Sequence, residues 1–172
     1  VPNFSEGTDQ TKINSIVSSI KSIQGVTVLD CDPGIDTNRT VVTFVGEPKS
    51  VIEAAFQGIK RASELIDMSL HKGTHPRIGA TDVCPIIPVS GVSIEECIEY
   101  SIILAEKVGL ELNIPVYLYE KSAIFPSREN LASIREGEYE GLEQKLKDKN
   151  WKPDFGPTKF NKSAGATVIG CR

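Results

Sequence analysis

The sequence predicts an α+β sandwich, in which helices pack on one face of a mainly antiparallel sheet. Short β-rich runs alternate with long segments whose apolar residues recur at helical spacing, which gives the order β-β-α-β-α-β after a first helix. The length of 172 residues is enough for one domain with a substantial core. A strand preceding Val1 would complete a split βαβ arrangement.

The first half of the chain contains one helix, two strands and a second helix. Residues 8–25 carry isoleucines at helical spacing and stop at Gly25, which predicts the first helix. The runs 26–32 (VTVLDCD) and 39–46 (RTVVTFVG) are β-rich and predict the strands. Residues 47–68 predict a long helix, because a proline suits its first turn and apolar residues form one stripe.

The second half begins with the run 82–91, whose two prolines favour an edge strand, an irregular strand or one beside a site. Ser93 and Glu96 have capping-box spacing and predict a helix that runs to about Leu112. Residues 114–120 (IPVYLYE) predict a fourth strand. Short polar helices follow, and a terminal strand begins at about Thr167.

Composition excludes several classes of protein. The chain is 40% hydrophobic and 24% charged with a net charge of −4, which argues against general nucleic-acid binding. It has no signal peptide and no apolar run of roughly 20 residues, so we expect no membrane span. The four scattered cysteines form no C-x-x-C pair, which favours a reduced, cytoplasmic protein. Both ends look cut, so we expect a portion of a longer chain.

Both histidines lie in the segment 69–82 (SLHKGTHPRIGATD). Gly73 and Pro76 disfavour a helix through the pair, so we do not expect His71 and His75 to share a helical face as in H-E-x-x-H. His71 follows a helix end, where a histidine is commonly structural. His75 lies in a restricted loop, the kind of place where a scaffold holds a working side chain, although such a residue can also be structural.

Two further loops carry candidate chemistry. Asp30 and Asp32 alternate along a strand end and therefore face the same side of the sheet. Carboxylates there could orient a histidine and raise its pKa, although aspartate also occurs in turns for backbone reasons alone. The glycines and lysines of residues 154–167 could bring the backbone close to an anion, but they match no phosphate-loop pattern.

Taken in order, these segments resemble the N-terminal subdomain of the glutamate formiminotransferase family. The resemblance rests on VPNFSEG (1–7), DPGIDTNRTVVTFVG (32–46), ELIDMSLHKGTHPRIGATDVCP (64–85), IPVYLYE (114–120), REGEYEGL (135–142) and the flanks of residues 151–167. It covers residues 1–172 as one subdomain and implies a ferredoxin-like fold. It also implies that a second subdomain follows, with the substrates held between the two, and that the units pair as homodimers.

The resemblance further implies transfer of the formimino group from N-formimino-L-glutamate to tetrahydrofolate, a co-substrate, without a metal. The active-site histidine of the family maps to His75, and the carboxylate near it maps to Asp32. The folate-contacting segment maps to Gly156, Pro157, Thr158, Lys159, Phe160, Asn161, Lys162, Ser163, Ala164 and Gly165. Two positions depart from the family: Thr74 stands where Glu is usual, and Ser90 stands where Arg is usual.

The chemistry of this reaction assigns a role to each candidate. One proton must leave the attacking amine and one must reach the departing nitrogen, which suits a histidine shuttle at His75 with Asp32 orienting it and balancing the cationic amidine. Arg39 and Arg77 are candidates for substrate carboxylates, or else surface ion pairs. Two alternatives stay open: a non-catalytic module that binds folate or a partner, and a metal-assisted hydrolase that uses His71, His75 and Asp82.

Overall fold

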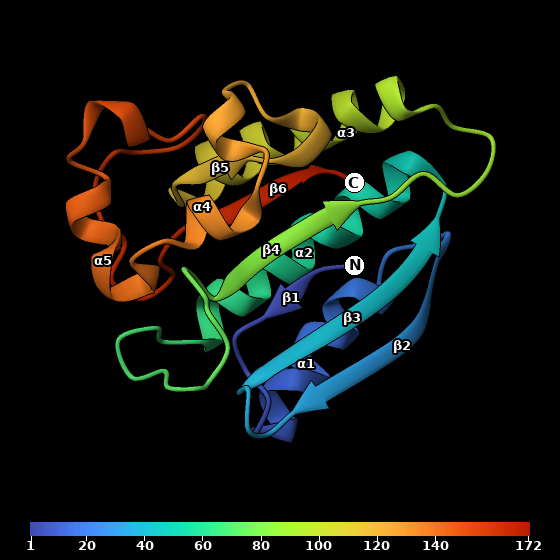
Figure 1. Ribbon diagram of the computed structural model, residues 1–172. Coiled ribbons are helices and arrows are strands. Elements are labelled where there is room, and N and C mark those ends of the chain that lie inside the picture. The colour runs from blue at the N-terminus through green and yellow to red at the C-terminus, as the bar shows by residue number, and fades with distance from the viewer.

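The computed structural model describes all 172 residues as a six-stranded sheet covered by helices (Figure 1). The sheet order is β2-β3-β1-β4-β6-β5. The strands are β1 (Asn3–Phe4), β2 (Val26–Gly34), β3 (Arg39–Gly46), β4 (Thr81–Ile86), β5 (Val116–Leu118) and β6 (Thr167–Cys171). The helices are α1 (Gln10–Lys21), α2 (Pro48–Leu65), α3 (Ile94–Leu112), α4 (Leu131–Arg135) and α5 (Glu138–Lys145), with short 3-10 turns at 120–122, 126–128 and 149–151.

The first four strands with α1 and α2 form a ferredoxin-like unit, as expected. β1 pairs antiparallel with both β3 and β4, and β2 pairs antiparallel with β3. β6 and β5 then extend the sheet in parallel pairs beyond β4. The sheet is therefore mixed, which corrects the expected mainly antiparallel arrangement, while the α/β class is confirmed.

The strand that completes the split βαβ unit lies inside the chain. We expected it before Val1, but β1 is formed by Asn3 and Phe4, which pair with Val41 and Thr40 of β3. Two residues are too short to give a periodic signal. The side chain of Phe4 is nevertheless almost fully buried, which explains why so short a strand holds the centre of the sheet.

Helix boundaries follow local capping chemistry. Asp9 caps α1 by accepting from the backbone N–H groups of Thr11 and Lys12. The predicted capping box of α3 is confirmed in both directions, because Ser93 accepts from the Glu96 amide and the Glu96 carboxylate accepts from the Ser93 amide. These contacts fix the register in which each helix buries its apolar stripe.

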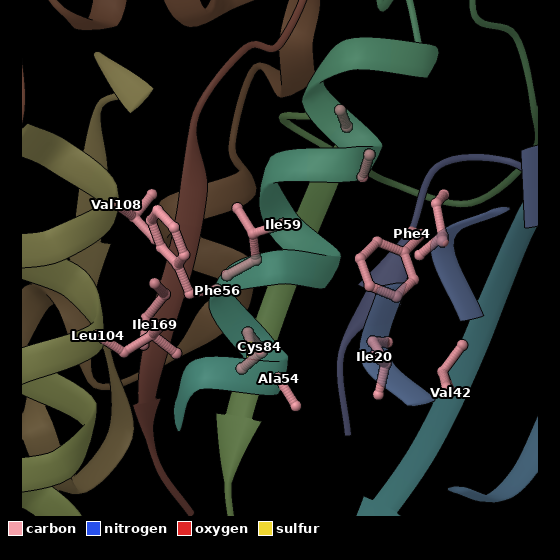
Figure 2. Close-up of a cluster of buried hydrophobic side chains, with 14 of the residues drawn as sticks. Phe4, Ile20, Val42, Ala54, Phe56, Ile59, Cys84, Leu104, Val108 and Ile169 are labelled. Atoms are coloured by element: carbon pink, nitrogen blue, oxygen red, sulfur yellow. The ribbon is translucent and has the colours of Figure 1, made fainter. Parts of the chain in front are cut away.

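The main core lies between the sheet and α1, α2 and α3. Figure 2 shows the α2 side chains between those of Phe4, Ile20 and Val42 on one side and Leu104, Val108 and Ile169 on the other. A second core of nine buried residues lies on the opposite face of β4, β5 and β6, under α4 and α5. Helices therefore cover both faces at this end of the sheet, which corrects the expectation of helices on one face only.

The opposite face of β2 and β3 has no such cover. Thr40, Val42 and Phe44 of β3 are buried toward the main core, whereas the residues between them are half exposed. In Figure 1 no helix lies in front of these two strands. No helix in the structure combines the length and the apolarity that crossing a bilayer requires.

β4 is an interior strand, which corrects the edge strand that was one of the alternatives favoured by the two prolines of residues 82–91. It lies between β1 and β6, and all six of its residues are buried. Pro85 is tolerated because β1 pairs with β4 only at Val83 and Thr81. The missing N–H of Pro85 therefore lies beyond the end of β1, where no ladder bond is needed.

Candidate functional site

The two histidines lie in the irregular segment between α2 and β4, as their neighbours Gly73 and Pro76 predicted. The segment packs directly on the loop between β2 and β3. A Cβ atom on Gly73 would lie 2.4 Å from the carbonyl oxygen of Thr37, so only glycine permits this approach. The side chain of Asn38 also donates to the Lys72 carbonyl at 2.9 Å.

Thr74 adds two contacts to the same loop. Its backbone N–H and its hydroxyl both donate to the Asp36 carbonyl, at 3.3 and 3.2 Å. Thr74 thus helps to hold the histidine segment against this loop. Ser90, the other departure, is exposed beyond the far end of β4, so the length of that strand separates it from His75.

His75 is half buried and has a partner at each ring nitrogen. Nδ1 lies 2.7 Å from the Pro76 carbonyl oxygen, which can only accept, so Nδ1 carries the proton. Nε2 lies 2.8 Å from Nη1 of Arg39, which can only donate, so Nε2 is the acceptor. Burial, followed by the nearby charges of Arg39 and Arg135, lowers the pKa of His75 below its usual value. These contacts are those of a neutral imidazole that is protonated at Nδ1.

His71 is held as part of the scaffold. Its Nε2 donates to the Asn38 carbonyl at 2.9 Å, and its Nδ1 accepts from Nε of Arg77 at 3.1 Å. Both ring nitrogens are thus used within the protein. This arrangement agrees with the structural role expected of a histidine just past a helix end.

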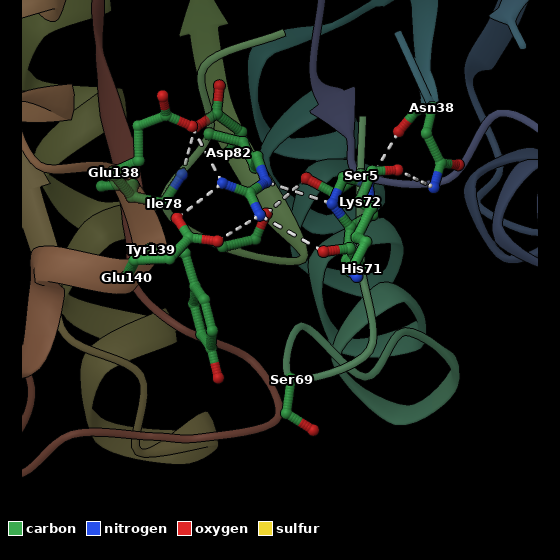
Figure 3. A network of polar contacts seen from close by, with 12 residues as sticks. Ser5, Asn38, Ser69, His71, Lys72, Ile78, Asp82, Glu138, Tyr139 and Glu140 are labelled. Atoms are coloured by element: carbon green, nitrogen blue, oxygen red, sulfur yellow. Dashed lines mark hydrogen bonds and ion pairs between the residues drawn. The ribbon is translucent and has the colours of Figure 1, made fainter. Parts of the chain in front are cut away.

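Arg77 is buried, and all five of its N–H donors are engaged. Nε donates to His71, and Nη2 donates to the His71 carbonyl and to Glu140 at 2.8 Å. Nη1 donates to Glu138 and to Glu140, both at 2.9 Å. Figure 3 shows the two glutamates reaching from the start of α5 toward the segment that carries His71. A substrate carboxylate would find no free donor on Arg77.

Arg39 differs from Arg77 in this respect. It is the first residue of β3, it is half buried, and its only side-chain hydrogen bond is the one to His75. Four of its five N–H donors therefore have no protein partner. Of the two arginines named from the sequence, Arg39 is the one that can bind a carboxylate.

Asp30 and Asp32 lie on the same face of the sheet as Arg39. They pair across the strands with Thr43 and Val41, and Arg39 pairs with Gly34 two positions along. Both carboxylates are exposed, and neither forms a hydrogen bond to His75. The partner that orients the ring is the Pro76 carbonyl, so the structure gives Asp32 a place near Arg39 without the orienting contact.

The segment 156–165 meets the histidine segment at its last residues. Gly165 forms an antiparallel bridge with Gly79, and the Ala80 amide donates to the Ala164 carbonyl at 2.9 Å. Gly165 has a φ of 67°, and a Cβ there would lie 2.1 Å from the Ile78 carbonyl oxygen. Backbone contacts therefore tie the segment mapped to folate contact to residues 78–80, a few positions after His75.

The three side chains that a metal-assisted hydrolase would need are committed elsewhere. Asp82 is fully buried, accepts from the Ile78 amide and pairs with Arg135, while His71 and His75 have the partners described above. No group of three His, Cys, Asp or Glu side chains has metal-binding geometry. A groove of about 740 Å³ lined by Phe125, Arg128 and Trp151 contains none of the candidate residues.

Several residues that shape the site were not predicted from the sequence. Arg135, Glu138 and Glu140 fix the histidine segment from positions some 60 residues away in the chain. Only the match of residues 135–142 to the family pointed to this stretch, and spacing alone could not have paired it with Arg77.

Comparison with known proteins decides the family. The model of the formiminotransferase domain, N-terminal subdomain, matches residues 1–172. The chain belongs to this family. It is 55% identical over its whole length to the formimidoyltransferase-cyclodeaminase of Mus musculus, of which it covers 32%. It is also 49% identical to the glutamate formimidoyltransferase of Streptococcus pyogenes serotype M1, of which it covers 58%.

A third formiminotransferase relative shows the same relation. The glutamate formimidoyltransferase of Thermoplasma acidophilum is 47% identical over 174 aligned residues and is covered to 57%. The chain thus spans between about a third and three fifths of the length of these relatives.

Proposed function

We propose that this chain supplies the acid–base residue of a glutamate formimidoyltransferase. In this reaction the formimino group moves from N-formimino-L-glutamate to tetrahydrofolate, which gives 5-formiminotetrahydrofolate and L-glutamate. The observation that carries the proposal is the state of His75: a neutral imidazole with one defined tautomer, beside a cationic residue with free donors. The names of the relatives support the same reaction.

His75 would act as the proton shuttle. A bond forms between the attacking amine and the amidine carbon, and the bond from that carbon to the glutamate nitrogen breaks. His75 takes the proton that leaves the amine and returns it to the departing nitrogen, so protons balance over the cycle. Shuttling of this kind typically contributes about 10²–10⁴-fold in rate. The lowered pKa of His75 keeps the ring neutral, which is the protonation state that a general base needs.

Asp30 and Asp32 would balance the charge of the substrate. The amidine is cationic near neutral pH, and both exposed carboxylates lie on the same face as Arg39. A cation that leaves water is stabilised by nearby carboxylates. In this arrangement Asp32 contributes to binding and to charge balance rather than to the orientation of His75.

The segment 156–165 fits an anionic folate only in part. Lys159 and Lys162 are exposed and can attract carboxylates, and Phe160 offers a half-buried ring packed at 5.4 Å from that of Tyr139. Asn161 instead holds the loop, because its Oδ1 accepts from the Ala164 amide. We therefore assign contact with folate to the exposed residues of the segment and a positioning role to its last two residues.

The uncovered face of β2 and β3 suits a second subdomain of the same protein. His75, Arg39 and Asp32 border this face, so a unit placed over it would enclose the substrates and exclude water. We also propose that the full-length protein forms a homodimer.

The test uses the full-length protein with the variant His75→Ala. We expect kcat to fall by about 10²–10⁴-fold while the dissociation constant for tetrahydrofolate stays within a few-fold of wild type. Gly141→Ala in α5, where an added Cβ meets nothing within 4 Å, is the matched control. Transfer at a near wild-type rate in His75→Ala would refute the shuttle. Folate binding without any transfer by the wild-type protein would favour the non-catalytic module.

A further inference from the structure

The Arg39–His75 hydrogen bond blocks the function proposed for His75. A general base accepts a proton through a lone pair, and Nδ1 of His75 already carries a proton that it donates to Pro76. The only lone pair in the ring is on Nε2, and it accepts from Arg39 at 2.8 Å. Arg39 must therefore leave Nε2 before His75 can take a proton.

A carboxylate ligand would compete with His75 for the guanidinium of Arg39. Its four free N–H donors can form a bidentate pair with a carboxylate, and charge-assisted pairs of this kind are about twice as strong as neutral hydrogen bonds. No protein carboxylate holds Arg39, since its single side-chain partner is neutral His75. Arg77 cannot make this exchange, because its five donors are already satisfied.

We propose that Arg39 is a substrate-responsive gate, which covers the base in the free enzyme and uncovers it when a carboxylate of the amino-acid substrate binds to the guanidinium. The inference rests on the proposed role of His75. It explains why the same arginine contacts the base and faces the open side of the sheet. A ligand without a carboxylate would leave the base covered, so the gate gives specificity as well as binding.

The charges around His75 determine whether a carboxylate bound to Arg39 raises or lowers the pKa of His75. Burial is the largest cause that lowers the pKa of His75, and the hydrogen bond to the Pro76 carbonyl opposes it. Among the charged groups, Arg39 of β3 and Arg135 of α4 lower this pKa, whereas Asp82 of β4 raises it. Asp82 is itself paired with Arg135, so this pair stays fixed while Arg39 can move. A carboxylate bound to Arg39 removes one opposing positive charge and therefore raises the pKa of His75.

The first experiment follows His75 by NMR in the full-length protein labelled at histidine. The signal is assigned by its loss in His75→Gln, and the pH titration is run with and without glutarate, a dicarboxylate that cannot react. We expect glutarate to raise the pKa of His75 in wild type. In Arg39→Met the pKa should already be raised and should no longer respond. Arg61→Met is the matched control and should respond as wild type does, because the half-exposed Arg61 of α2 pairs with Ser15 and Glu64 and with none of the candidate residues.

The second experiment measures kinetics of the same variants. Loss of a bidentate charged contact corresponds to about 1.5–3 kcal/mol, so Arg39→Met should raise KM for formiminoglutamate by about 10–150-fold. The acid limb of its kcat/KM profile should move to higher pH, an effect that a merely structural arginine would not cause.

Equal His75 titrations with and without glutarate in wild type would overturn the gate, as would an unchanged response in Arg39→Met. Both of these NMR results are obtained without turnover, so failure of the gate is distinguishable from failure of the shuttle.

Discussion

Asp82 and Arg135 form an ion pair that joins the start of β4 to the end of α4, with the aspartate side chain fully buried. The second oxygen of Asp82 accepts from the Ile78 amide at 2.9 Å. One carboxylate thus ties together a central strand, a helix on the far face and the segment that follows His75. Asp82 was a candidate metal ligand from the sequence, whereas in the structure it is a buried anchor between these elements.

Asp82→Asn tests the anchor. The amide oxygen can still accept from Ile78, but Arg135 loses its counter-charge in a largely buried position. Removing one partner of a buried pair costs about 3–5 kcal/mol, which should appear as a lower free energy of unfolding in urea. Glu64→Gln, which breaks an exposed pair with Arg61, should cost less than about 1 kcal/mol. Equal effects of the two substitutions would contradict the anchor role.

Gly79→Ala probes the junction between the histidine segment and the segment 156–165. A Cβ at Gly79 would lie 2.0 Å from the Ala166 carbonyl oxygen and 2.7 Å from that of Ala164. The two backbones must separate, so we expect a loss of about 2–3 kcal/mol in unfolding free energy and weaker folate binding. Gly141→Ala in α5 meets nothing and should stabilise by about 0.5–1 kcal/mol. A stable Gly79→Ala protein with normal folate affinity would show that the junction is unimportant.

Arg77→Lys tests whether the network around Arg77 positions the histidine segment. Lysine keeps the charge but cannot satisfy Glu138, Glu140 and His71 at once, because it lacks the planar fork of donors. We expect about 2–3 kcal/mol of lost stability and faster amide exchange at residues 71–78. In kinetics, kcat should fall more than KM rises. A large rise in KM with kcat unchanged would instead indicate direct contact between Arg77 and a substrate carboxylate.

Local sequence patterns predicted most of the elements. Ser93 and Glu96 act within one helical turn, so their spacing alone located the start of α3. The terminal strand begins at Thr167 as expected. β1 escaped because its stability comes from the burial of Phe4 and from pairing with strands 36 and 78 residues away, neither of which leaves a local pattern.

The candidate site was predictable only in part, because some of its contacts, like those of β1, join residues far apart in the sequence. Loop chemistry and family resemblance singled out His75, and the structure gives it defined partners at both ring nitrogens. The sequence could not distinguish Arg39 from Arg77, because the difference lies in Glu138 and Glu140, which reach Arg77 from another part of the fold. Long-range ion pairing, rather than residue type, decides which arginine remains free for a ligand.

The pH dependence of stability should report on His75 independently of activity. Its pKa is lowered in the folded protein, first by burial and then by Arg39 and Arg135, so the unfolded chain binds this proton more tightly. Protonation therefore favours unfolding. The contribution of His75 to stability is fully present above the unfolded pKa of about 6.5 and is lost as pH falls through and below that value.

Urea unfolding of wild type and His75→Gln between pH 5 and 8 measures this contribution. Other titrating groups cancel in the difference between the two proteins, so wild type should lose more stability than the variant as the pH is lowered. Arg39→Met should show a smaller loss than wild type, since one of the charges that opposes protonation is gone. Parallel stability curves for wild type and His75→Gln would mean that His75 titrates as it does in the unfolded chain, and would contradict a lowered pKa of His75 in the folded protein.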